Sequence, residues 1–290
     1  MENKYLSLIE KKLAEYLPSE ECSEKSVISA MKYSLLASGK RIRPTLTLAF
    51  CEALGGDIEA AVPYACAVEM IHCYSLIHDD LPCMDDDDIR RGRPSNHKVY
   101  GEDIALLAGD ALQALAFDIM LRDESVRKAG IQGAKAAHIL ARECGANGMV
   151  GGQVIDLETE GKDPTLETIS EMYAKKTGAI IKAACLMGAV IANADEAAIN
   201  AAAVYAEKIG LAFQIVDDIL DIESDTETLG KPVGSDAENE KVNYVTKVGV
   251  EQGRLLAEKL TSEAVEALKA IGGDTVFLKE LAEKLAHRIK

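Results

Sequence analysis

The sequence predicts an all-α protein, with residues 1–290 folded as one helical bundle. Hydrophobic residues make up 48% of the chain and aromatic residues only 4%, a balance that favours packed helices over strands. Apolar residues recur at helical spacing through most of the chain, and no stretch alternates as a strand does. A chain of 290 residues can bury one large core or two modest ones, and no linker divides it.

In the first third of the chain, helix breakers and a capping residue mark the expected elements. Apolar periodicity predicts a helix over residues 2–17, ended by Pro18, and a second helix that stops at Gly39. Asp57 is the expected N-cap of a long helix over residues 58–80, because a short acidic side chain accepts from the first free amides. That helix is apolar almost throughout, so we expect it in the core.

After a polar connector expected at residues 94–100, the helical pattern continues to the C-terminus. Thr165 and Asp195 are the expected caps of two later helices. Small residues within 148–156 are expected where two helices approach closely, and residues 176–178 predict a break inside a core helix. The other expected helical segments are 103–121, 125–144, 243–272 and 275–289.

Charge and cysteine usage exclude several classes of protein. The net charge of −16 argues against a nucleic-acid partner. The N-terminus does not resemble a signal peptide, and no uncharged apolar run reaches the roughly 18 residues of a membrane span. The seven cysteines are scattered without a Cys-x-x-Cys pair, which is typical of reduced thiols in a cytoplasmic protein.

Residues 79–93 hold six aspartates within ten positions, followed by three arginines. Carboxylates repel each other by roughly 1–4 kcal/mol at about 4 Å, depending on the local dielectric, and a bound cation relieves this repulsion. Mg²⁺ binds one or two carboxylates together with substrate phosphates, and arginine binds phosphate through paired hydrogen bonds. A solvated acidic loop is the alternative, but these aspartates directly follow an apolar helix. The pattern therefore favours a Mg²⁺–phosphate site.

Asp217 and Asp221 indicate a second cation site by the same argument. Four residues apart on a helix, their carboxylates share one face and lie about 5–6 Å from each other. Upstream, residues 39–43 form a basic turn after a helix, which is either an ordinary helix terminus or an anion site built on Lys40 and Arg43.

Gln153 and Asp156 share a helix face three residues apart. They are either functional or a buried hydrogen-bonded pair, and the sequence leaves both interpretations open.

In this order along the chain, the motifs resemble those of the trans-isoprenyl diphosphate synthases. Residues 79–85 with the arginines at 90 and 91 look like the first aspartate-rich motif of that family, and residues 213–221 look like the second. The resemblance covers nearly the whole chain. It implies an all-α bundle with a deep central cavity, usually a homodimer, in which the two motifs face each other across the cavity mouth.

The resemblance also implies a reaction and a role for each matching residue. Isopentenyl diphosphate would condense with dimethylallyl or geranyl diphosphate after Mg²⁺-assisted ionisation releases pyrophosphate. Three Mg²⁺ ions are implied, held by Asp79, Asp85, Asp217, Asp218 and Asp221. The allylic diphosphate would bind Arg90, Lys176, Lys231 and Lys241, and isopentenyl diphosphate would bind Gly39, Lys40, Arg43, His72 and Arg91. The implied catalytic residues are Asp79, Asp80, Asp85, Lys176, Thr177, Gln214, Asp217 and Asp218.

The expected product length depends on Tyr74. It lies five residues before Asp79, roughly 7 Å along the helix axis, where a bulky ring beside Ser75 would form a floor that stops elongation. Tyr74 and the insertion Pro82-Cys83 resemble bacterial farnesyl diphosphate synthases, so the expected product is (E,E)-farnesyl diphosphate, C15. Plant-type geranylgeranyl diphosphate synthases share the insertion, so a C20 product is the alternative.

Other functions remain as competing hypotheses. A terpene cyclase shares the metal-triggered ionisation but needs no second diphosphate site, so the basic turn with His72 argues against it. A non-catalytic partner subunit of a heteromeric prenyltransferase would be expected to lack one aspartate motif, and both are intact here. Taken alone, His72 would be a satisfied core histidine. Residues 240–245 depart from the family pattern, because they lack its glycine and proline around Lys241.

Overall fold

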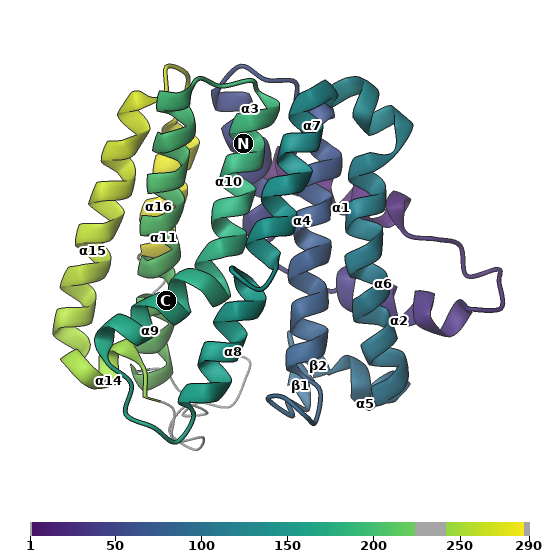
Figure 1. Cartoon of the computed structure of the whole chain (residues 1–290), viewed down its shortest axis with the longest axis horizontal. Coiled ribbons are helices and arrows are strands. Elements are labelled where there is room, and N and C mark those ends of the chain that lie inside the picture. The colour runs from purple at the N-terminus through teal and green to yellow at the C-terminus, as the bar shows by residue number, and fades with distance from the viewer. Residues whose placement is uncertain (1, 224–241, 287–290) are drawn as a thin grey trace.

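Helices account for nearly all regular structure in the computed structural model, which describes residues 2–223 and 242–286 (Figure 1). The all-α prediction is confirmed. The first half of the chain forms α1 (Glu2–Tyr16), α2 (Lys25–Leu35), α3 (Ile42–Ala53), α4 (Ile58–Asp79), α5 (Asn96–Tyr100), α6 (Glu102–Leu121) and α7 (Asp123–Cys144). The second half forms α8 (Met149–Thr159), α9 (Leu166–Tyr173), η1 (Ala174–Gly178), α10 (Ala179–Ile191), α11 (Glu196–Glu223), α14 (Tyr244–Val248), α15 (Val250–Ala267), η2 (Leu268–Ala270) and α16 (Val276–Ala286).

One short hairpin interrupts the helices of the described residues. Strand β1 (Ile89–Arg90) pairs antiparallel with β2 (Arg93–Pro94) directly after the aspartate-rich loop. Sequence periodicity does not predict this hairpin, because two residues per strand leave no alternation to detect. The prediction of a polar connector over residues 94–100 is wrong at its end, where α5 forms. The buried Asn96 amide donates to the Ala30 carbonyl at 2.8 Å and holds α5 against α2.

Three of the predicted helix caps are confirmed, whereas α2 begins after Glu24 without a side-chain cap. The Asp57 carboxylate accepts from the Glu59 amide at 2.9 Å, and the Thr165 hydroxyl accepts from the Thr168 amide at 3.2 Å. Asp195 accepts from the Ala198 amide at 2.8 Å. Each side chain satisfies an amide that has no partner within its own helix, so these residues fix where α4, α9 and α11 begin.

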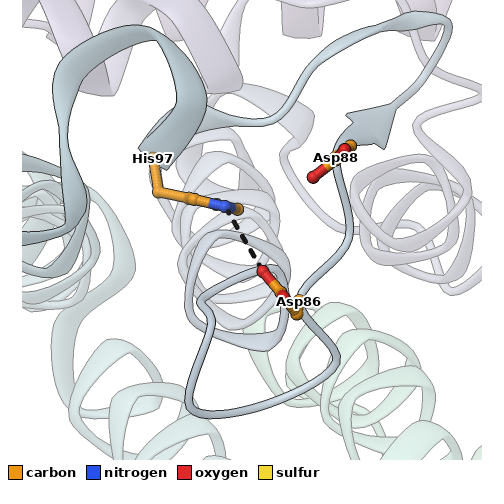
Figure 2. A group of neighbouring side chains, drawn as sticks. All are labelled: Asp86, Asp88 and His97. Carbon is orange, nitrogen blue, oxygen red and sulfur yellow. Dashed lines mark ion pairs between the residues drawn. The ribbon is translucent and has the colours of Figure 1, made fainter.

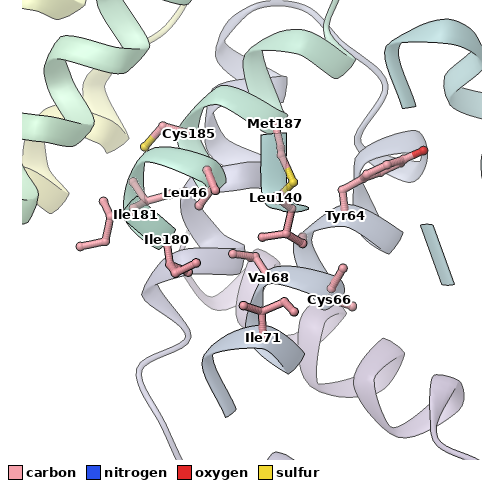
Figure 3. Packing of buried hydrophobic residues seen from close by; sticks show 14 of the residues in the cluster. Leu46, Tyr64, Cys66, Val68, Ile71, Leu140, Ile180, Ile181, Cys185 and Met187 are labelled. Atoms are coloured by element: carbon pink, nitrogen blue, oxygen red, sulfur yellow. The ribbon is translucent and has the colours of Figure 1, made fainter. Parts of the chain in front are cut away.

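Helix α4 lies in the centre of the bundle and packs against α3, α6, α7 and α10. Figure 3 shows Leu46 of α3, Val68 and Ile71 of α4, Leu140 of α7 and Ile180 of α10 meeting in this core. A smaller core lies between α11, α14 and α15. All seven cysteines are free thiols, as predicted.

By length and composition alone, α4 and α6 could each cross a membrane. In α4, 83% of the apolar window is buried within the protein, as in the core helix of a soluble protein, which passes the same test. In α6 the buried share is 39%, and Leu106 and Leu107 lie exposed on its outer face. The outer face of α6 is therefore apolar beyond what the described helices cover.

The break predicted at residues 176–178 is a π-helical turn. Segment η1 joins α9 directly to α10, and π-helical turns often occur at functional sites. The small residues of α8 lie against it, as predicted, because a Cβ on Gly152 would come within 2.1 Å of the Lys176 amide nitrogen. The absent side chain allows the two backbones to touch and places Lys176.

The two aspartate motifs end up at the same end of the bundle. Helices α4 and α11 both run toward the end of the molecule where β1, β2, α8 and α9 also lie (Figure 1). Asp79 is the last residue of α4, and Asp217 lies near the end of α11. This arrangement follows from the lengths and directions of helices that the core fixes. The deep central cavity stays a prediction.

We expect Gly152→Ala to destabilise the protein. The added methyl group would overlap the η1 backbone, and overpacking of this kind typically costs about 1–3 kcal/mol. The higher helix propensity of alanine would offset only part of that loss. Urea unfolding followed by circular dichroism measures the change. Gly272→Ala is the matched control, because nothing lies within 4 Å of its Cβ position. Equal stability of the two variants would contradict the close approach of α8 and η1.

Candidate active site

The first aspartate motif begins where α4 ends. After Asp79 the chain turns back, so that the Asp85 amide donates to the Asp79 carbonyl at 2.9 Å. Burial raises the pKa of Asp79 to about 6; the Lys176 ammonium opposes this shift and the Asp85 carboxylate adds to it. Two carboxylates at a partly buried helix end repel each other, an arrangement that favours a bound cation.

Asp80 has a different environment from Asp79, since only 2% of it is exposed. Arg90 donates to its carboxylate from Nε at 2.7 Å and also from Nη2, and reaches Asp87 at 2.7 Å. Burial raises the pKa of Asp80 to about 6, against the stabilising effect of Arg90. Asp80 therefore holds Arg90, and with it β1, against the end of α4. The predicted diphosphate ligand Arg90 is oriented by a predicted catalytic residue.

The basic turn after α2 contains one structural cation. Arg41 is 2% exposed and adopts a left-handed backbone with a φ of 46°. Its guanidinium donates to Glu69 and to Glu10, both at 2.7 Å, and to two carbonyls at the end of α2. Glu69 was not predicted, although an acid inside the apolar α4 was an available signal. Lys40, by contrast, is exposed on the turn.

Arg43, His72 and Arg91 come together beside that turn. A Cβ on Gly39 would lie 2.9 Å from Arg91 Nη1, so the glycine allows this guanidinium to pack against the turn. Burial lowers the pKa of His72 well below its usual range, and the charges of Arg43 and Arg91 lower it further. A neutral imidazole among guanidinium groups marks a positive potential, which suits an anion. This group is called the arginine pocket below.

The second aspartate motif lies on α11. Asp218 is buried and accepts from the Tyr173 hydroxyl at 2.7 Å and from the Tyr244 amide at 3.1 Å. Asp218 therefore joins α9 and the start of α14 to α11. Asp217, one residue earlier, is only partly buried. Tyr173 was not predicted, because nothing in the sequence links it to a carboxylate 45 positions away.

Lys176 connects the two halves of the site. Its ammonium lies 2.5 Å from the Asp156 carboxylate of α8, so Asp156 pairs with Lys176 and not with Gln153, whose buried Nε2 has no hydrogen-bond partner among the described residues. Thr177 of η1 and Gln214 of α11 are both partly exposed. Their elements touch where the Cβ position of Gly210 lies 3.1 Å from Gly178. The predicted catalytic residues thus lie at the end of α4 and in the loop after it, on η1 and on α11.

A family model described as polyprenyl synthetase matches residues 24–272. The chain belongs to this family. The geranylgeranyl diphosphate synthase of Cyanophora paradoxa is 48% identical over 263 residues, covering 90% of this chain and 87% of the relative. Among solved structures, an apo FPP/GFPP synthase from Zymomonas mobilis has a TM-score of 0.88 at 37% identity, with 98% of this chain and 97% of that chain covered.

A geranyltransferase from Helicobacter pylori, complexed with magnesium and isoprenyl diphosphate, has a TM-score of 0.84 at 30% identity, covering 99% of this chain and 97% of that chain. As a member of the polyprenyl synthetase family, the protein is a prenyltransferase, and the predicted isoprenoid-synthase fold is confirmed. The roles of single residues stay predictions. Lys231 and Lys241 lie outside the described residues.

In this prenyltransferase the predicted product-length residues lie on the buried side of α4. Tyr74 is 6% exposed, and its ring meets the His78 ring edge to face at 5.5 Å between centroids. The Ser75 hydroxyl donates to the His72 carbonyl at 3.0 Å. His78 occupies the space above Gly109 of α6, where a Cβ would come within 2.1 Å of its ring. Tyr74 is therefore held by its neighbours.

We expect inorganic pyrophosphate, added without metal, to raise the pKa of His72 toward its usual range. The anion would offset the positive charges of Arg43 and Arg91, which now disfavour the imidazolium. Histidine resonances followed by NMR during a pH titration measure the shift. Arg43→Gln should weaken the response, and the exposed His138 on α7 should not respond to the anion. An unchanged His72 at saturating pyrophosphate would exclude the arginine pocket as the anion site.

Proposed function

We propose that this prenyltransferase condenses isopentenyl diphosphate with dimethylallyl or geranyl diphosphate and extends the product to geranylgeranyl diphosphate, C20. The observation that carries the proposal is the joint position of three features at one end of the bundle. The aspartate ends of α4 and α11 lie there together with β1 (Figure 1), and Arg91 of the arginine pocket directly follows β1. Two substrates that each carry a diphosphate require two anion sites. This end supplies carboxylates that can bind metal ions for one diphosphate and cationic side chains for the other.

Mg²⁺ fits the carboxylates of this end. Asp79, Asp85 and Asp217 with Asp221 offer hard oxygen ligands, and the raised pKa of Asp79 reflects carboxylates crowded in a partly buried place. The Helicobacter pylori relative is described with bound magnesium. We propose three ions per site, which would supply electrostatic stabilisation to the departing pyrophosphate.

The other steps belong to residues of the chain. Arg43, His72 and Arg91 hold the diphosphate of isopentenyl diphosphate and aim its double bond. Lys176, fixed by Asp156, neutralises charge on the leaving group. The dipoles of Thr177, Gln214 and the η1 backbone face the allylic cation. The new carbon–carbon bond forms at that cation, and the released pyrophosphate takes the proton lost from the adduct.

We also propose that the enzyme is a homodimer. The exposed apolar residues Leu106 and Leu107 on α6 support this, because an apolar helix face of this kind commonly marks an interface between subunits. Sedimentation equilibrium showing only monomer would contradict it.

A C15 product is the second candidate. The relatives named geranylgeranyl diphosphate synthases favour C20, whereas the buried ring of Tyr74 on α4 favours an early floor. The two differ by a single further addition of isopentenyl diphosphate, so one assay decides between them.

The deciding experiment incubates the purified protein with isopentenyl diphosphate, Mg²⁺ and either dimethylallyl or geranyl diphosphate. We expect C20 alcohols from both starters after phosphatase treatment and chromatography. Products that stop at C15 would replace C20 with the second candidate. Asp79→Asn should lower kcat by roughly 10²–10³-fold, whereas Asp123→Asn at the exposed start of α7 should not. Folded protein without condensation would refute the proposed reaction.

Tyr74→Ala tests the floor separately. If Tyr74 limits the chain, its removal should shift the product distribution by at least one isoprene unit upward, since the ring is buried and leaves space behind. Tyr33→Phe, a change at a hydroxyl that binds Pro94, is the control. An unchanged distribution in Tyr74→Ala would place the floor elsewhere. Thermal unfolding of each variant separates a change of product from a loss of fold.

A further inference from the structure

Three side chains that the proposed reaction does not use meet on the outer side of the aspartate loop. Asp86 and Asp88 of this loop and His97 of α5 place one ligand atom each within 4.8 Å of one another. Figure 2 shows both carboxylates near the imidazole, with the Asp86 carboxylate facing the ring. The two aspartate side chains are 60% and 73% exposed, whereas the histidine side chain is 3% exposed. The cluster is therefore a buried nitrogen donor beside two exposed carboxylates.

His97 supplies the observation that points to a ligand. Its Nε2 is buried and has no hydrogen-bond partner among the described residues. Its closest acid is Asp86, whose Oδ1 lies 4.0 Å away, too far for a hydrogen bond. An unsatisfied buried nitrogen is unfavourable unless something else binds it. The nitrogen points into the cluster, so a third group between the ring and the carboxylates would satisfy it.

We propose that Asp86, Asp88 and His97 bind a divalent transition-metal ion, with Zn²⁺ in first place. One imidazole nitrogen and two carboxylate oxygens with an open fourth position are a zinc ligand set, whereas Mg²⁺ prefers oxygen alone. Bonds of about 2.0–2.2 Å in a tetrahedron place ligand atoms about 3.4 Å apart. The ligand atoms now lie within 4.8 Å of one another, and rotation of the exposed Asp86 and Asp88 side chains would bring them to that distance.

The surroundings of His97 prepare it for this role. Ser95 is buried, and its hydroxyl lies 3.2 Å from His97 Nδ1. A hydrogen bond there directs the Nδ1 proton to the serine and leaves the lone pair of Nε2 for the metal, as a second group behind a metal-binding histidine commonly does. The Ser95 amide also donates to the Asp88 carbonyl at 2.9 Å. One serine thus connects two of the three ligands.

The present partners of the carboxylates do not prevent binding. Lys98 lies 2.6 Å from Asp88 Oδ1, but this ion pair is exposed and therefore weak. Asp86 has a left-handed backbone with a φ of 50°, which acidic and amide side chains adopt more readily than most. Asp86→Asn is therefore compatible with the loop. A bound ion would join the loop after α4 to α5 and hold the segment that carries Asp85.

The test measures Zn²⁺ uptake by equilibrium dialysis in a large excess of Mg²⁺, which competes at all-oxygen sites. We expect one Zn²⁺ per chain in the wild type and a loss of affinity of about tenfold or more in the double variant Asp86→Asn, Asp88→Asn. The control Asp110→Asn, Asp123→Asn removes the same charge from exposed positions on α6 and α7 and should bind as the wild type does. Circular dichroism of each variant verifies the fold.

A third variant separates this site from the aspartate motifs. Asp79→Asn with Asp217→Asn should retain the Zn²⁺, because neither residue belongs to the cluster. Co²⁺ in place of Zn²⁺ should give the strong visible absorption of a four-coordinate ion, and the Asp86, Asp88 variant should lose it. No uptake by the wild type would overturn the proposal. So would uptake that survives in the Asp86, Asp88 variant or that disappears in the Asp79, Asp217 variant.

Discussion

The concentration of carboxylates at one end of the bundle is the constraint on which the rest of the structure depends. Each aspartate motif uses one member to hold the fold. Asp80 is buried under Arg90, and Asp218 is buried under the Tyr173 hydroxyl and the Tyr244 amide. Unpaired charges at these positions would oppose folding, because burying a carboxylate without a donor is strongly unfavourable. Because Asp80 and Asp218 are held in this way, the neighbouring aspartates can stay at the end of the bundle, where a cation can reach them.

The same principle governs the cations. Arg41 forms ion pairs with Glu69 and Glu10, and Lys176 forms one with Asp156. Fixed cations keep their positions when a diphosphate arrives, so little reorganisation is needed at that moment. In the arginine pocket, the acid nearest to Arg91 is Glu69 at 3.9 Å, already shared with Arg41. That sharing leaves uncompensated positive charge in the pocket, which adds to the effect of burial in lowering the pKa of His72.

Local signals were sufficient for most of the helices and for three of their caps, because each depends on residues near in sequence. The caps at Asp57, Thr165 and Asp195 were predicted for that reason. The partners of the site residues were not, since Glu69 with Arg41 and Tyr173 with Asp218 join positions 28 and 45 residues apart. Sequence spacing assigns side chains to a helix face, but it does not determine which neighbouring helix that face meets. Product length is harder still to predict from the sequence. The prediction used the ring of Tyr74 on α4, whereas the depth of a cavity depends on side chains from several helices.

Five of the six aspartates within residues 79–88 divide into two groups because the backbone reverses between them. Asp79, Asp80 and Asp85 stay with the bundle end, where the Asp85 amide binds the Asp79 carbonyl. At Asp86 the chain turns through a left-handed conformation, and the carboxylates of Asp86 and Asp88 face outward toward His97. One acidic run therefore offers carboxylate oxygens on two sides. On the outer side, these oxygens lie near the imidazole nitrogen of His97. Since Asp85 and Asp86 are adjacent, an ion on the outer side restricts the same peptide that positions the inner carboxylate.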